Sequence, residues 1–152
     1  YGLGRIGRAN LDGTDVELDF IPGGAIPPAS AVDANSIYWQ GDNGWVNRAD
    51  IDGGNANHAF VYVENGGRGL SVNATHIYWS ANAGMISRMD LDGTNLTLDL
   101  VVGVSTWGLA IDSQYLYWIE EASIGRSALD GSSADHAWIL NIGDMQTLAI
   151  GP

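Results

Sequence analysis

The sequence predicts an all-β fold, a β-propeller of four-stranded antiparallel blades, with about 3.75 blades in the 152 residues of this chain. Two observations predict it. A pair of short motifs recurs with a period of ~40 residues, which is typical of folds that copy one small unit in tandem. Each copy also contains four short strand-like segments, and four strands per repeat of this length is the pattern of propeller blades.

Two markers define the repeat. An aliphatic residue followed by Tyr-Trp occurs three times, as Tyr38-Trp39, Tyr78-Trp79 and Tyr117-Trp118. An arginine four residues ahead of an Asp-Gly pair occurs four times, with Arg8 before Asp12, Arg48 before Asp52, Arg88 before Asp92 and Arg126 before Asp130. Because both markers keep the same register, we expect the same local structure in every copy.

The copy at residues 65–103 shows the four expected strands, which we name a to d. They cover 69–72, 76–80, 85–91 and 96–102, with Asn, Asp and Gly turn residues between them. No segment keeps a helical period over ten or more residues. Since Ile-Tyr-Trp is apolar on successive residues, strand b is expected to be covered on both faces, as in a blade between two neighbours.

The other copies divide the chain in the same way, into repeats at approximately 1–24, 25–64, 65–103 and 104–143 and a trailing strand within 144–152. Strand a is expected at 29–32, 109–111 and 148–150, strand b at 37–39 and 116–118, and strand d at 17–21, 59–63 and 137–140. Strand c is expected to begin at Ile6, Val46 and Ile124. The count is three complete blades, two leading strands and one trailing strand.

An isolated arc of blades would leave apolar faces and sheet edges in water, which favours aggregation. Three arrangements avoid this. The sequence can be part of a longer propeller, two or more copies can complete a ring together, or the chain can close alone as a small four-bladed ring.

Composition excludes several kinds of partner. The net charge is −12, with six arginines as the only basic residues apart from three histidines, which disfavours both nucleic acid and anionic membranes. No apolar run is long enough to predict a membrane span. The absence of cysteine excludes disulfides, thiol catalysis and Cys–zinc sites.

The motifs resemble those of the YWTD repeat, the class B repeat of the low-density-lipoprotein receptor. The similar segments are Ile-Tyr-Trp, Ile86 to Gly93, and Gly-Leu-Ala-Ile-Asp at 108–112, and together with their copies they cover essentially the whole chain. The resemblance implies a six-bladed propeller, an extracellular or secreted location, and binding of a protein partner. This chain departs from the family after Tyr-Trp, where Gln40-Gly41, Ser80-Ala81 and Ile119-Glu120 replace the Thr-Asp whose aspartate braces neighbouring blades in the family.

Three motifs that suggest ligands are better explained by structure. Residues 2–7 spell Gly-x-Gly-x-x-Gly, but no helix is expected after them, so they do not predict nucleotide binding. The Asp-Gly pairs lack the spacing of a calcium loop and are typical of tight turns. The three histidines lie in different repeats, so we expect no metal site and no cofactor, although an acidic surface can bind divalent cations opportunistically.

The recurring arginines are expected to be structural. Arg8, Arg48, Arg88 and Arg126 occupy one repeat position, so each is expected to pair with a carboxylate or carbonyl of its own or the adjacent blade. No Ser-His-Asp or paired-carboxylate constellation is recognisable.

Residues that do not repeat are the candidates for binding, because the fold does not require them. The b–c and d–a loops of a propeller share one face, which we call the loop face. The candidates on it are Arg68, Trp107 and Gln146, where strand a begins, and Asp42, Trp45, Glu120 and Glu121, in b–c loops. An exposed tryptophan can anchor a partner, whereas the alternative is that Trp45 and Trp107 fill gaps between blades.

These observations predict a non-enzymatic scaffold that binds a protein or peptide through the loop face, outside the cytoplasm. One alternative is a lectin-like propeller, since Trp and Tyr stack on sugars, with a glycan as its ligand. Another is part of a metal-dependent propeller lyase, whose His–acid cluster is not found in these residues. The remaining partners are other copies of the chain, or the remainder of a longer one, completing the ring.

Overall fold

The computed structural model describes residues 4–23, 28–41, 44–63, 66–81, 84–104, 106–143, 145 and 147–150. Within these residues fourteen strands form four antiparallel sheets, and no helix is present. Consequently none of the described segments is a helix long and apolar enough to cross a bilayer.

The strands are short and follow the repeat. In chain order they are β1 (Ile6–Arg8), β2 (Glu17–Ile21), β3 (Ser30–Val32), β4 (Ser36–Gln40), β5 (Trp45–Asp50), β6 (Asn57–Tyr62), β7 (Gly66–Val72), β8 (His76–Ala81), β9 (Met85–Asp90), β10 (Thr97–Val102), β11 (Thr106–Ile111), β12 (Tyr115–Glu120), β13 (Ser123–Ala128) and β14 (Asp135–Leu140).

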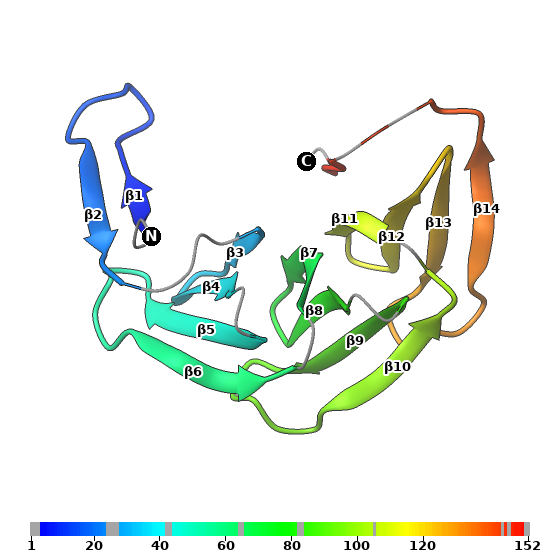
Figure 1. Cartoon of the computed structure of the whole chain (residues 1–152), viewed down its shortest axis with the longest axis horizontal. Helices are drawn as coiled ribbons and strands as arrows, with labels where there is room; N and C mark the ends of the chain where they lie inside the picture. The colour runs from blue at the N-terminus through cyan, green and yellow to red at the C-terminus, as the bar shows by residue number, and fades with distance from the viewer. Residues whose placement is uncertain are drawn as a thin grey trace.

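Each sheet is one blade in which consecutive strands are neighbours. Blade one has two strands, β1 and β2, and blades two, three and four have four strands each, β3–β6, β7–β10 and β11–β14. Figure 1 shows the blades arranged around an axis, with β3, β7 and β11 innermost and β6, β10 and β14 outermost. The blades form an open arc rather than a closed four-bladed ring, with a gap between blade one and the C-terminal end. The predicted all-β propeller fold is confirmed.

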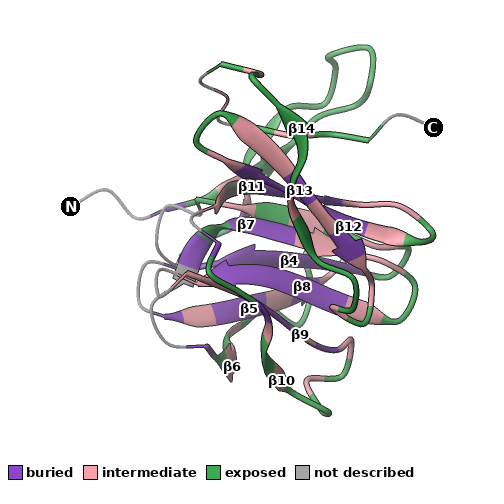
Figure 2. Cartoon of the chain, turned by 90° about the vertical axis from the view of Figure 1, so that its right-hand side faces the viewer, coloured by how far each residue is buried: buried purple, intermediate pink, exposed green. Residues whose placement is uncertain are grey.

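The core lies between blades, and the Tyr-Trp marker builds it. Because successive strand residues point to opposite faces, tyrosine faces the next blade and tryptophan faces the preceding one. Tyr38 of blade two packs with Trp79 of blade three, and Tyr78 of blade three packs with Trp118 of blade four. Both faces of β4 and β8 are therefore buried, as Figure 2 shows.

Blades are also joined by hydrogen bonds from side chains of one blade to the backbone of the next. Gln40 Nε2 donates to the Ser80 carbonyl at 3.3 Å, Ser71 Oγ to the Leu109 carbonyl at 3.0 Å, and Arg88 Nη1 to the Leu129 carbonyl at 2.9 Å. Each acceptor is a backbone carbonyl of the following blade, so these contacts do not depend on one side chain being repeated.

Two sequence-based expectations about strands are wrong. Residues 147–150 are not a strand, because no described strand pairs with them, although this segment lies against Gly108 of β11 where an inner strand would lie. The second concerns strand d, which the sequence predicts to begin at residues 59 and 137, just after His58 and His136. They lie within β6 and β14, because strand d starts one residue before each of them.

Candidate functional site

The loop face carries the candidate site. Antiparallel neighbours alternate in direction, so strands b and d end at the same edge of a blade where strands a and c begin. The b–c turns and d–a connections therefore lie on one face around the axis. Two cavities open among them, one at the corner of blade four and one near the axis.

The structure places the expected residues as follows. Glu120 ends β12 and Trp45 begins β5, so both are strand residues rather than loop residues, and Trp45 is half-buried with its ring edge against Tyr62 at 5.1 Å. Glu121 lies exposed in the β12–β13 turn, and Arg68 is an exposed residue of β7. Trp107 belongs to β11, but its side chain lies outside the described residues, as do Asp42 and Gln146.

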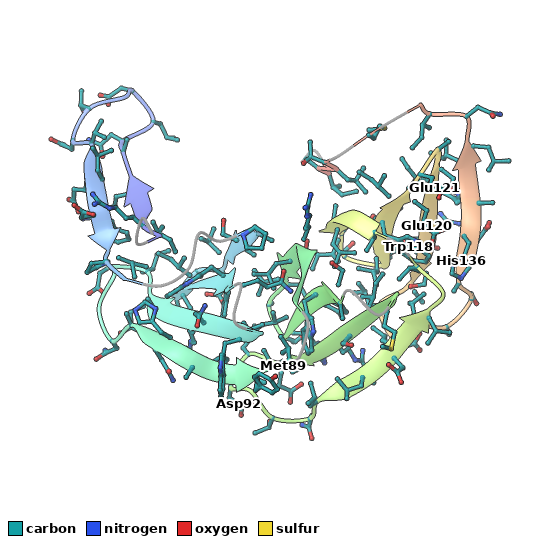
Figure 3. All side chains as sticks on the ribbon, viewed as in Figure 1. Met89, Asp92, Trp118, Glu120, Glu121 and His136 are labelled. Carbon is teal, nitrogen blue, oxygen red and sulfur yellow. The ribbon has the colours of Figure 1, made fainter. Side chains whose placement is uncertain are left out.

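Three side chains meet at one corner of blade four. The Trp118 indole Nε1 donates to Glu120 Oε1 at 2.8 Å, and His136 Nδ1 lies 3.0 Å from the same oxygen. The rings of Trp118 and His136 meet edge to face at 5.6 Å. Figure 3 shows these residues side by side, and we call Trp118, Glu120 and His136 the blade-four corner.

The neighbouring backbone is tied to this corner. Ser123 Oγ lies 3.3 Å from the Glu120 carbonyl and 3.2 Å from the His136 carbonyl, so its hydroxyl can donate to either one. Glu121 follows in the turn with a φ of 35°, a left-handed conformation that is uncommon for a side chain other than glycine. The Glu120 carboxylate is thus held by Trp118 of its own strand and by His136 of β14, on the far side of β13.

A cavity of about 420 Å³ lies directly beside the corner. Its lining residues are Gly103, Glu120, Glu121, Ala122, Ser123, Leu140 and Asn141. The Glu120 side chain is only 19% exposed, whereas Glu121 is exposed at the rim. Two carboxylates, an amide and the apolar surface of Leu140 suit a cationic group on an aliphatic stem, such as a lysine or arginine side chain.

Among the three complete blades the corner carboxylate is specific to blade four, whereas a Trp–His ring contact also occurs in blade two, between Trp39 and His58 at 5.5 Å. Glu120 stands where blade two has Gly41 and blade three has Ala81. The b–c connection of blade four is one residue shorter, since Ile119 pairs with Ile124 whereas Gln40 pairs with Val46 and Ser80 with Ile86. Glu120 therefore pairs with Ser123 across a turn of two residues, whereas the equivalent Ala81 pairs with Met85 across three.

The tryptophan indoles of blades two, three and four differ in their polar contacts among the described residues. In blade two, with the Asn47 amide oriented to satisfy both groups, its oxygen accepts from Trp39 Nε1 at 3.1 Å. In blade three Ser87 replaces that asparagine, and Trp79 Nε1 is buried without a partner. In blade four Gly125 takes the position, and a Cβ there would lie 2.2 Å from the Trp118 indole. Only in blade four is the partner a carboxylate.

The second cavity, also of about 420 Å³, lies near the axis. Its lining residues are Pro28, Ala29, Ser30, Arg68, Gly69, Leu70, Gly108, Leu109, Thr147 and Leu148. These belong to the inner strands β3, β7 and β11 and to the C-terminal segment. Arg68 is the only charged side chain among them, so this cavity differs from the acidic corner in sign.

The described residues contain no group of three or more His, Asp or Glu side chains that could hold a metal ion. The repeated aspartates are instead used within their own turns, where Asp12, Asp52, Asp92 and Asp130 each accept from a backbone N–H two residues later. Hydrogen bonds from the side chains and backbone of Thr14, Thr94 and Ser132 lower the pKa values of Asp12, Asp92 and Asp130 respectively.

Sequence reasoning missed His136, Ser123 and Asn141. They lie at the site because β12 and β14 pair with β13 on its two opposite edges, so the ends of these three strands are close together. The available signal was the second residue of strand d, which is a histidine in both blade two and blade four. In blade two the rings of His58 and Trp39 also meet edge to face, at 5.5 Å, with Asn47 between them.

Comparisons with known proteins support the fold. No family model and no curated protein match this sequence. Among solved structures, a chain of the crystal structure of a nidogen–laminin complex resembles this one with a TM-score of 0.72 and 17% sequence identity. The match covers 97% of this chain and 60% of that one, so this chain spans less than two thirds of its neighbour. The fold is a YWTD-like β-propeller, and identity at this level shows the fold alone.

Proposed function

We propose that this chain is a β-propeller scaffold that binds a protein or peptide through its loop face, with a cationic side chain of the partner in the cavity at the blade-four corner. The observation that carries the proposal is the Glu120 carboxylate, held through Oε1 by Trp118 and His136 at the edge of that cavity. A carboxylate held by its neighbours loses little conformational freedom when it binds, which favours affinity.

Charge and shape agree with this partner. A net charge of −12 attracts basic segments and speeds their association. The cavity accommodates one side chain rather than a folded domain, whereas the surrounding turns and the Trp45–Tyr62 pair offer a wider contact area. The similar propeller comes from a complex of two proteins, which supports a protein partner and a location outside the cytoplasm.

The corners of the three complete blades differ from one another, which favours a single binding site. A lectin-like propeller is expected to repeat equivalent sites around its ring. Here the equivalent positions carry Gly41, Ala81 and Glu120, and only the last can bind a cation. We therefore favour a basic peptide over a glycan.

The test uses a library of random peptides selected on the immobilised chain, followed by affinity measurements on single peptides. We expect the selected peptides to be enriched in Arg or Lys. Glu120→Gln should weaken their binding about 10-fold or more, because a charged hydrogen bond contributes about 1.5–3 kcal/mol. Glutamine can still accept from Trp118, so the fold should be unchanged.

The matched control is Glu17→Gln, which removes an exposed carboxylate paired with Arg8 on blade one, away from the corner. It should leave peptide affinity unchanged. Selected peptides without basic residues, or equal affinities for Glu120→Gln and the unsubstituted chain, would contradict the proposed site.

A further inference from the structure

Each blade is covered by a turn of the blade that follows it. The Asp-Gly turn between strands c and d lies on the fourth residue of strand d of the preceding blade. A Cβ on Gly53 would lie 2.9 Å from the Phe20 ring, and one on Gly93 would lie 3.2 Å from the Phe60 ring. One on Gly131 would lie 2.9 Å from Leu100 Cγ. The same contact therefore occurs three times, and at each turn a glycine is needed for the close approach.

The covering turn also brings opposite charges together. Beyond the hydrogen bonds from Thr94, the positive charge of Arg48 in blade two helps to lower the pKa of Asp92 in blade three. Likewise, beyond the hydrogen bonds from Ser132, Arg88 in blade three helps to lower the pKa of Asp130 in blade four. At these two contacts an arginine and an apolar side chain of one blade thus receive the Asp-Gly turn of the next.

Blade four presents the receiving half of this contact without a covering turn. Trp138 occupies the position of Phe60 and Leu100 and is 39% exposed, whereas both of those are half-buried. Arg126 lies between two rings, 4.5 Å from the Trp138 centroid and 4.4 Å from that of Tyr115. An aromatic surface carrying a positive charge is therefore already formed.

Blade one presents the other half. The Asp12-Gly13 turn is built like the others, with Thr14 capping Asp12 and a φ of 82° at Gly13. Yet no described atom lies within 4 Å of the Cβ position of Gly13, and Asp12 is exposed. The opposite ends of the arc in Figure 1 thus carry complementary halves of the contact that joins every adjacent pair of blades.

We propose that these two ends bind each other between molecules, so that the Asp12-Gly13 turn of a second copy of this chain sits on Trp138 and Arg126 of the first. Gly13 then lies against the Trp138 ring as Gly53 lies against Phe20, and Asp12 faces Arg126. The association is head to tail, because the two surfaces differ. Like net charges oppose it, but at 0.15 M salt the repulsion is screened beyond about 8 Å, whereas the direct contacts are not.

The test is the molar mass of the purified chain, measured by light scattering over a series of concentrations at 0.15 M salt. We expect the mass to rise above the monomer value of 16.1 kDa as concentration increases. Gly13→Asn should hold the mass at that of the monomer, because its Cβ would collide with Trp138. Asparagine is among the residues that best tolerate positive φ, so the turn itself should persist.

The matched control is Gly143→Asn. Gly143 has a φ of 70° and no described atom near its Cβ position, so it has a similar backbone conformation but lies outside the Asp12-Gly13 turn. It should associate like the unsubstituted chain. If Gly13→Asn fails to fold by circular dichroism, Asp12→Asn takes its place, since it keeps the acceptor for Thr14 and should weaken association by removing the charge that faces Arg126.

A second pair of variants examines the receiving surface. Trp138→Ala should weaken association, whereas Tyr62→Ala, which removes an exposed aromatic residue from strand d of blade two, should not. A chain that remains at 16.1 kDa at every concentration would overturn the proposal and leave this surface to another occupant. Association that Gly13→Asn, or Asp12→Asn in its place, leaves unchanged would overturn it as well.

Discussion

Blades three and four share the same markers but differ in what covers them. Blade three lies between two neighbours, and both Tyr78 and Trp79 are completely buried. Among the described residues blade four has a neighbour on one side only. Trp118, which faces that neighbour, is completely buried, whereas Trp138 on the opposite face is 39% exposed. Each blade of this chain thus carries large apolar side chains on both faces. The outer face of blade four keeps such a residue, Trp138, although no described blade packs against it.

The two blades also direct their tyrosine hydroxyls differently. Tyr117 in blade four donates to Asp112 in its own a–b turn at 2.9 Å. Blade three has Asn73 at that position, and Tyr78 donates instead to the Leu129 carbonyl of blade four at 3.3 Å. Blade two has Asp33 in that turn and keeps its tyrosine bond within the blade, like blade four, although it has neighbours on both sides. One turn residue, rather than the cover, therefore decides whether this bond crosses between blades.

The largest expected effect contrasts a covered with an uncovered tryptophan. Trp79→Ala should lower the free energy of unfolding by about 3–5 kcal/mol, because it empties a fully enclosed site between blades. Trp138→Ala should cost only about 1 kcal/mol, chiefly through its contacts with Arg126 and Tyr117. Urea denaturation of dilute protein measures both, and equal costs would show that blade three is not enclosed.

A second contrast compares the same turn with and without a blade beneath it. Gly131→Ala places a Cβ against Leu100, whereas Gly13→Ala meets no described atom, and both residues have φ near 80°. Both variants therefore carry the same backbone strain, but only in Gly131→Ala does the new Cβ collide with a neighbouring residue, Leu100. Gly131→Ala should be less stable than Gly13→Ala by about 1–3 kcal/mol in thermal or urea unfolding. A difference near zero would mean that the turn of blade four does not rest on blade three.

A smaller effect should follow from satisfying the tryptophan of blade three. Ser87→Asn introduces the residue that blade two uses to accept from its tryptophan, and Trp79 Nε1 is buried without a partner. A new buried hydrogen bond should raise the free energy of unfolding by about 1 kcal/mol. Ser127→Asn, at a buried serine of β13 that pairs with Leu116 rather than a tryptophan, should give no gain. A loss of stability in Ser87→Asn would indicate that the site has no room for the amide.

The smallest effect concerns pH. Backbone N–H groups of Gln114 and Tyr115, together with the Tyr117 hydroxyl and the charge of Arg126, lower the pKa of Asp112 below its usual range. A carboxyl group with a lowered folded-state pKa stabilises the fold fully above its unfolded value of about 3.9, and this contribution is lost as pH falls through the lower folded value. Asp112→Asn should therefore reduce the slope of stability against pH in acid. An unchanged slope would contradict the role of Asp112.

The fold was predictable because each local signal agreed with the repeat. Tyr-Trp marked strand b, Asp-Gly marked the turn between strands c and d, and both recurred in one register. The strand expected at 148–150 was the exception, because strand formation requires a partner that sequence pattern alone does not guarantee. Strand d of blade two begins earlier than residue 59, because pairing of Asn57 with Arg48 of β5 extends the strand over His58.

The candidate site was predictable only in part. Glu120 and Glu121 stood out because they do not repeat, and both line the corner cavity. His136 did not stand out, because its contact with Glu120 joins β12 to β14, two strands that are not neighbours in the sheet. The uncovered surface at Trp138 could not be predicted from the sequence. The contact between an Asp-Gly turn and strand d of the preceding blade becomes visible only in the packing of the other three turns.

Hydrogen exchange in β10 and β14 tests most directly whether each blade is made to be covered by the turn that follows it. Both are outermost strands of six residues, but the Asp-Gly turn of blade four lies on Leu100 of β10, whereas no described turn glycine approaches Trp138 of β14. In dilute protein, amides of β10 should exchange more slowly than those of β14, and the difference should narrow as concentration rises and second copies bind. Equal exchange in the two strands at every concentration would contradict the account.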